Sequence, residues 1–148
     1  MLPMEPASLV MERKMLRGIK QRARALNAFL VDVYGRGEIV RAGRIPADEI
    51  FRNSQYRPEM HGVDVASNIY AHIAGIDVVR AGAGEYYVLE DNLRVPSGVS
   101  YVLENWAISK RAFADLFAQQ SILPVDGYTD ELNRMLVSIA PDGVAEPT

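Results

Sequence analysis

Two runs of β-branched and aromatic residues flank a short glycine-containing turn in the middle of the chain. The first run extends from Ile69 to Val79 and the second from Tyr86 to Leu89, with Ala81-Gly82-Ala83-Gly84 between them. Strand-forming runs joined by so short a turn form an antiparallel hairpin. We therefore predict strand structure over 69–92, folded back on itself at the glycines.

Helical patterns lie on both sides of this predicted hairpin. Apolar residues recur every three or four positions in the segment that precedes Gly35, and Arg and Lys occupy much of the remainder, which is typical of an amphipathic helix with a solvated basic face. The segment Gly35–Asn68 is polar and irregular. We expect helices over about Ala7–Tyr34, from Pro46, over about Val99–Phe117, and over roughly Thr129–Ile139 with Thr129 as N-cap. The fold class is therefore α/β in the broad sense (α+β), a hairpin sheet packed by helices.

Composition excludes several classes of site and partner. The chain has 148 residues, no Cys and only two His, so thiolate chemistry and three-His metal sites are excluded. A metal site would have to use oxygen ligands, which favours Mg²⁺ or Mn²⁺. The net charge of −3 argues against a nucleic-acid-binding protein, and no apolar run is long enough to cross a membrane. We expect a cytoplasmic protein without a secretory signal.

The hairpin carries a candidate metal site. A tight turn centred between Gly82 and Ala83 would set Arg80 opposite Glu85 and Asp77 opposite Val88. Because side chains alternate between the faces of a strand, Asp77, Val88, Glu90 and Asn92 would share one face.

In this register Asp77 and Glu90 are diagonal neighbours, about 7–8 Å apart at the backbone. Two carboxylates and the amide oxygen of Asn92 would form a hard-oxygen site for Mg²⁺. Acidic residues at a hairpin end are also common as simple soluble strand ends, and that interpretation stays open. The unbroken polar run Glu90-Asp91-Asn92 favours the metal site, because a solvated strand face would show alternation.

The segment after the hairpin, Leu93–Tyr101, resembles an anion-binding loop. It combines Arg94, a Pro, and Ser97-Gly98 directly before the next predicted helix. Backbone N–H groups at a helix start and a guanidinium are both suited to phosphate or carboxylate. The alternative is an ordinary helix start with Arg94 in solvent.

The run Val88–Tyr101 closely resembles the circularly permuted ATP-grasp family. Two flanking stretches, Gly18–Asn27 and Gly75–Arg80, strengthen this resemblance, which extends from about Arg17 to Pro141. The Asp followed by Glu-x-Asn is also similar to the metal hairpin of ATP-grasp enzymes in general, including glutathionylspermidine synthase-like proteins.

The resemblance implies an ATP-dependent carboxylate–amine ligase, with ATP and Mg²⁺ (or Mn²⁺) as cofactors and a small carboxylate or amine as substrate. It implies metal ligation by Asp77, Glu90 and Asn92. We expect catalytic roles for Arg80 and Arg94. In the simple register Arg80 lies on the opposite face from Asp77, so its contact with a phosphate or substrate anion would require a bulge. Arg94, Ser97 and Gly98 match a substrate or phosphate loop.

The chain also departs from the family pattern. The family domain normally continues beyond the region of Pro141, no Lys lies in a glycine-rich loop, and Glu104-Asn105-Trp106 replaces the usual Glu-Asn-Arg. We therefore expect one partial ATP-grasp domain over 1–148, with flexible ends at 1–6 and 142–148.

Such a partial domain would not catalyse alone, and would bind Mg-nucleotide weakly or only with a second chain that supplies the missing lobe. The alternative is a non-catalytic remnant or interaction module that keeps the fold. A third interpretation, a metal-independent module for small anions, rests only on Arg94 and the basic first helix. Exposed apolar surface would lead to self-association.

Overall fold

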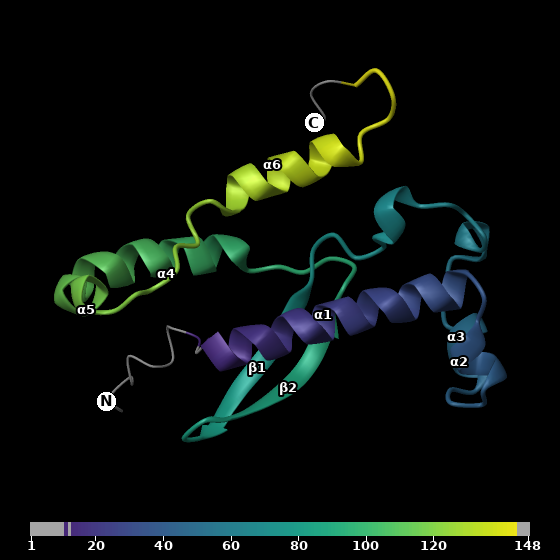
Figure 1. The fold of residues 1–148 in the computed structure, drawn as a ribbon, viewed down its shortest axis with the longest axis horizontal. Coiled ribbons are helices and arrows are strands. Elements are labelled where there is room, and N and C mark those ends of the chain that lie inside the picture. The colour runs from purple at the N-terminus through teal and green to yellow at the C-terminus, as the bar shows by residue number, and fades with distance from the viewer. Residues whose placement is uncertain (1–10, 12, 145–148) are drawn as a thin grey trace. The chain divides into compact units, whose positions relative to one another are not determined.

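The computed structural model describes residues 11 and 13–144, which divide between two compact units. Among the described residues, one unit contains residues 11, 13–16 and 75–144, and the other is Arg17–Ala74. Figure 1 shows the order of the elements along the chain. The expectation of a single domain over 1–148 stays a prediction. Of the expected flexible ends, 1–6 and 142–148, residues 1–6 and 145–148 lie outside the described residues, and flexibility at 142–144 stays a prediction.

The long first helix, α1 (Arg13–Tyr34), confirms the predicted amphipathic pattern. Its expected start, residues 7–10 and 12, lies outside the described part of the chain, and the helix ends directly before Gly35 as predicted. The basic side chains are all exposed, so this face is solvated. The apolar positions are all buried or half-buried: Leu16, Ile19, Ala23, Leu26, Phe29, Leu30 and Val33.

The connection after α1 contains short helices rather than regular strands. They are α2 (Glu38–Arg41), α3 (Ala47–Phe51) and two single 3₁₀ turns, η2 (Pro58–Met60) and η3 (Ala66–Asn68). The predicted helix start at Pro46 is confirmed, with acidic residues in the first turn of α3. Helix α2 was not predicted, since four residues are too few to show a helical period.

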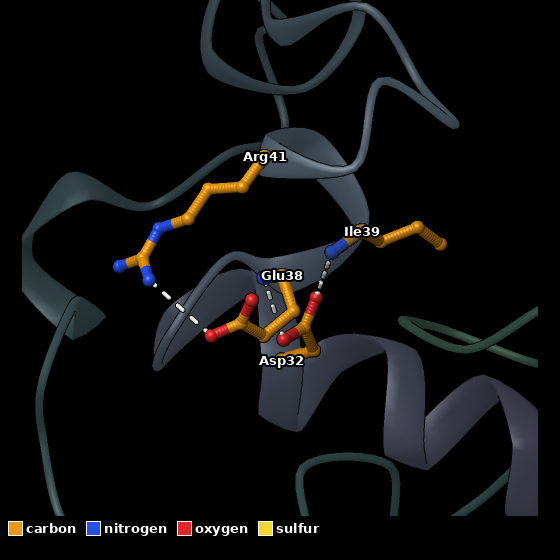
Figure 2. Close-up of polar contacts among 4 residues, drawn as sticks. All are labelled: Asp32, Glu38, Ile39 and Arg41. Atoms are coloured by element: carbon orange, nitrogen blue, oxygen red, sulfur yellow. Dashed lines mark hydrogen bonds and ion pairs between the residues drawn. The ribbon is translucent and has the colours of Figure 1, made fainter.

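Asp32, in the last turn of α1, supplies the cap of α2. Its carboxylate oxygens accept hydrogen bonds from the backbone N–H groups of Glu38 and Ile39, at 2.8 and 2.9 Å (Figure 2). Its own carbonyl accepts from the N–H groups of Gly35 and Gly37. One residue thus ends α1 and starts α2, because its carboxylate satisfies donors that a helix start leaves without intrahelical partners.

Asn27 holds the far end of the connection against α1. Its side-chain N–H donates to the carbonyl of Asn68 at 2.9 Å, and its Oδ1 accepts from the N–H groups of Tyr70 and Ala71 at 2.8 and 3.2 Å. In the same segment, Ser67 and Asn68 adopt left-handed backbone, with φ of 56° and 55°. The bonds to Asn27 offset the cost of these two conformations.

Three tyrosine rings stack within the Arg17–Ala74 unit. Tyr34 lies between Tyr56 and Tyr70, with ring centroids 5.3 and 5.4 Å away and nearly parallel planes. Phe51 meets Tyr56 edge to face at 5.2 Å. The stack ties three separated parts of the Arg17–Ala74 unit together.

We expect Asn27→Ala to destabilise the Arg17–Ala74 unit. The substitution removes partners from one carbonyl and two N–H groups, so the free energy of unfolding should fall by about 1–3 kcal/mol. Urea unfolding followed by circular dichroism measures the change. Gln21→Ala, at an exposed position of the same helix, is the control and should change stability far less. Equal effects of the two substitutions would contradict the role given to Asn27.

The unit from Gly75 onward ends in three helices, α4 (Val99–Ala112), α5 (Ala114–Gln119) and α6 (Tyr128–Ser138). The prediction of one continuous helix to Phe117 is wrong, because Phe113 leaves helical backbone with φ −123° and ψ 42°. Thr129 is not the N-cap of α6. Gly127 holds that position, without a side-chain cap.

The described residues contain very little fully buried core. Among them Val33, 3% exposed, is the one buried apolar residue, and Ser109 is the one buried polar residue. Trp106 of α4 packs edge to face on Phe117 of α5, with ring centroids 5.1 Å apart. No helix among the described residues, 11 and 13–144, is long and apolar enough to cross a bilayer.

Candidate functional site

The predicted hairpin is present, with β1 (Gly75–Gly82) and β2 (Glu85–Asn92) paired antiparallel. Figure 1 shows it as two long arrows joined at one tip. The strand begins six residues later than predicted, since 69–74 is not strand. The N–H groups of Tyr70 and Ala71 bind the Asn27 side chain, so they are not available to a strand partner.

The register of the hairpin differs from the predicted one. Gly82 pairs with Glu85 across a two-residue turn at Ala83-Gly84, so the turn lies one residue later than expected. Arg80 pairs with Tyr86, and the predicted pairing of Arg80 with Glu85 is wrong. The pairing is irregular at two places, between Arg80 and Gly82 on β1 and opposite the Asp77–Val78 step.

The second irregularity places two acidic residues in one cross-strand pair. Val78 pairs with Val88, and the residue that precedes it on β1, Asp77, pairs with Glu90. Leu89 is therefore the extra residue of a bulge. The predicted pair Asp77–Val88 is therefore wrong, and Val88 lies on the opposite face from Asp77. Asp77 and Glu90 are direct neighbours across the strands, closer than the diagonal placement that was expected.

Asn92 joins this pair on the same face. It lies two residues after Glu90 on β2, and its side-chain amide donates a hydrogen bond to Glu90 Oε1 at 2.9 Å. Asp77 and Glu90 are exposed and Asn92 is half-buried. We name Asp77, Glu90 and Asn92 the hairpin triad. The shared face follows from the strand register, whereas metal binding by the triad stays a prediction.

The donor chemistry of the hairpin triad fits a hard cation. Like charges directly opposite each other destabilise a sheet, and a bound divalent ion would remove that repulsion. The hydrogen bond to Glu90 uses the amide nitrogen of Asn92, which leaves the amide oxygen as a ligand atom. No group of three or more His, Cys, Asp or Glu residues that could hold a metal ion is found among the described residues.

The predicted basic and loop residues are distributed around the hairpin. Arg80 lies on the face opposite the triad, as the alternation implied, and its Nε donates to the carbonyl of Gly82 at 3.2 Å. Arg94 and Ser97 are exposed in the loop that follows β2. Gly98 is the N-cap of α4 with φ 89°, left-handed backbone that favours glycine. Anion binding by Arg94, Ser97 and Gly98 stays a prediction.

Large apolar side chains stand exposed around the same segment. Tyr87 and Leu89 on β2, Val95 in the loop and Tyr101 on α4 are each 60–77% exposed. A separate groove of about 440 Å³ lies beside Trp106 and Phe117, and none of the predicted site residues lines it. The hairpin region therefore presents both carboxylates and apolar surface to solvent.

The family model described as a circularly permuted ATP-grasp matches residues 10–148. The chain belongs to this family. The match spans the hairpin and all of the helices, and it confirms the family resemblance and the α+β class. The narrower likeness to glutathionylspermidine synthase stays a prediction.

Several much longer proteins are similar to this chain. An uncharacterised protein of Synechocystis is 45% identical over 135 residues, which cover 91% of this chain and 28% of that protein. One from Mycobacterium tuberculosis is 42% identical over 89% of this chain and 24% of its own length. A Frankia casuarinae protein provisionally named glutamate–cysteine ligase 2-2 is 40% identical over 84% of this chain and 14% of that protein. The chain thus spans about a quarter or less of the length of these relatives.

The prediction from sequence missed two residues beside the site. Gly75 pairs with Asn92 at the open end of the hairpin, and Pro96 of the following loop lies against Gly75. The only available signal was their place in the family-like stretches, which gives no indication of mutual contact. Their proximity depends on how the loop folds back after β2.

Proposed function

We propose that this chain carries the magnesium-binding and acyl-phosphate corner of an ATP-dependent carboxylate–amine ligase. Family membership supports the ligase class in general, and the name of the Frankia relative agrees with it. The observation that carries the proposal is the direct pairing of Asp77 with Glu90, with Asn92 bonded to Glu90 on the same face. We infer a cytoplasmic setting, where ATP and Mg²⁺ are available.

In this proposal each residue of the site has a distinct task. The hairpin triad would hold Mg²⁺, which when bound neutralises phosphate charge during transfer of the γ-phosphoryl group to a substrate carboxylate. Arg94, together with the backbone N–H groups that follow Gly98, would hold the anionic phosphate or carboxylate by charge and hydrogen bonds.

Arg80 lies less favourably for contact with the same phosphate or carboxylate. It lies on the opposite face of the hairpin from the triad, so it could act on the same anion only from the strand edge near the turn. The amine that attacks the acyl phosphate, and the acid that is activated, would be small molecules. Their identity would depend on parts found in the longer relatives, of which this chain spans about a quarter.

We expect this chain to bind Mg-ATP weakly and in a metal-dependent way. Glu90→Gln and Asn92→Ala should each lower the affinity by about tenfold or more, because each removes an oxygen ligand or its charge. Calorimetric titration of ATP with and without Mg²⁺ measures the effect. Glu85→Gln, at the turn end of the same strand, is the matched control and should bind as the parent chain does.

Two results would contradict the proposal. One is ATP binding that is equal with and without Mg²⁺, which would favour the metal-independent anion module. The other is an equal loss of affinity in Glu85→Gln, which would show that the charge of the strand matters and the position of the triad does not.

The second candidate function is a non-catalytic interaction module. The exposed apolar residues around the hairpin favour it, because a domain that works alone rarely presents so many. The partner we propose is the polypeptide by which the longer relatives extend beyond the matched segment, supplied by the same polypeptide or by a second chain. Absence of ATP binding at any Mg²⁺ concentration, with the fold intact, would support this module over the ligase corner.

The exposed apolar residues should cause self-association of the isolated chain. Replacing Leu89 and Val95, which are 69% and 77% exposed, by Ser should reduce it, since each contributes apolar area that another copy can cover. Light scattering across a concentration series measures the mean mass. Val63→Ser, a 44% exposed site in the other unit, is the control. A parent chain that is monomeric at the highest concentration would contradict this expectation.

A further inference from the structure

We infer that Gly75 is a positioning residue that seats the loop after β2 against the hairpin triad. The inference deepens the proposed function and rests on it for its consequence in nucleotide binding. Its structural part, the contact between Gly75 and Pro96, stands on the geometry of one unit of the chain.

Gly75 occupies the triad face at the open end of the hairpin. It pairs directly with Asn92 and lies two residues before Asp77, so its missing side chain would point to the same side as those of the triad. A Cβ built on Gly75 would lie 3.5 Å from Asn92 Cβ, which is ordinary contact. The same Cβ would lie only 2.8 Å from Pro96 Cβ, closer than side-chain carbons approach in proteins.

Pro96 therefore fills the space above Gly75. It follows Asn92 by four residues, so the chain after β2 must turn back over the triad face to reach this place. Pro96 Cβ is part of a ring that is fixed to the backbone, and it cannot rotate away as a flexible side chain would. The loop that carries Arg94 and Ser97 is thus anchored beside Asn92 by a contact that only glycine permits.

The requirement for glycine at this position is one of space. Gly75 is absent from the residues with positive φ, so an alanine could adopt its backbone conformation without strain. Gly82, at the other end of β1, also lacks a positive φ, and the nearest atom to a Cβ there is Glu85 Oε2 at 3.6 Å. Gly82→Ala is therefore a matched control, the same substitution in the same strand without the close contact.

The test compares four variants of the full chain by Mg-ATP calorimetry and by nuclear Overhauser contacts. Gly75→Ala should lower Mg-dependent affinity by about tenfold, because it displaces the loop or Asn92 from the triad. Gly82→Ala should bind as the parent chain does. Pro96→Gly removes the anchoring ring and should also weaken binding. Gly75→Ala combined with Pro96→Gly should bind better than Gly75→Ala alone, since the clashing carbon is gone.

A merely structural effect of alanine on the hairpin would not be rescued by a change at Pro96. A double variant no better than Gly75→Ala, or a Gly82→Ala variant equally impaired, would overturn the inference. Gly75→Ala should retain the cross-strand contacts of Asp77 with Glu90 and lose the contact between residue 75 and the Pro96 ring. Loss of the Asp77–Glu90 contacts as well would mean that Gly75 supports the hairpin and does not seat the loop.

The structural readout separates this inference from the proposed function. If the parent chain binds no Mg-ATP, the proposed function fails, and the Overhauser contact between Gly75 Hα and the Pro96 ring decides the inference alone. Presence of that contact, with its loss in Gly75→Ala, supports the seating role. Its absence in the parent chain overturns that role, whatever the nucleotide result.

Discussion

The bulge at Leu89 is the local constraint on which the candidate site depends. It inserts one residue into β2 between the pairs Val78–Val88 and Asp77–Glu90, and so it places the two acidic residues directly opposite each other across the strands. Without the bulge, Asp77 would face a different residue of β2, because a register slip of one residue exchanges the faces of a strand. The chemistry of the hairpin is therefore a consequence of a backbone irregularity, and the bulge residue itself contributes an exposed apolar side chain.

The site combines features that are unfavourable for an isolated domain. Two like charges face each other, and large apolar side chains nearby remain exposed, while the described residues include only one fully buried apolar residue. Both features would be stabilised by binding, the charges by a divalent cation and the apolar side chains by more polypeptide. Relatives that are about four times longer than the matched segment agree with this interpretation.

Local patterns predicted the helices better than the strands. The apolar positions predicted for α1 are all buried or half-buried, because an amphipathic helix repeats one signal over many residues. The strand start was wrong, since the Asn27 side chain takes the N–H groups of Tyr70 and Ala71 from a distance of more than forty residues. The predictions of one continuous helix over 99–117 and of Thr129 as N-cap of α6 were also wrong. The ends of elements depend on contacts that local propensity does not include.

The sequence by itself determined the family and the presence of a hairpin, and it placed Asp77, Glu90 and Asn92 on one strand face, because residue type and alternation are local properties. That these three residues form a metal site stays a prediction. Only the tertiary structure decided that Asp77 pairs with Glu90, that Val88 lies on the other face, and that Pro96 rests on Gly75. A bulge and a loop closure are set by the competition of backbone hydrogen bonds and packing across the whole hairpin. That competition has no signature in the spacing of the residues that it brings together.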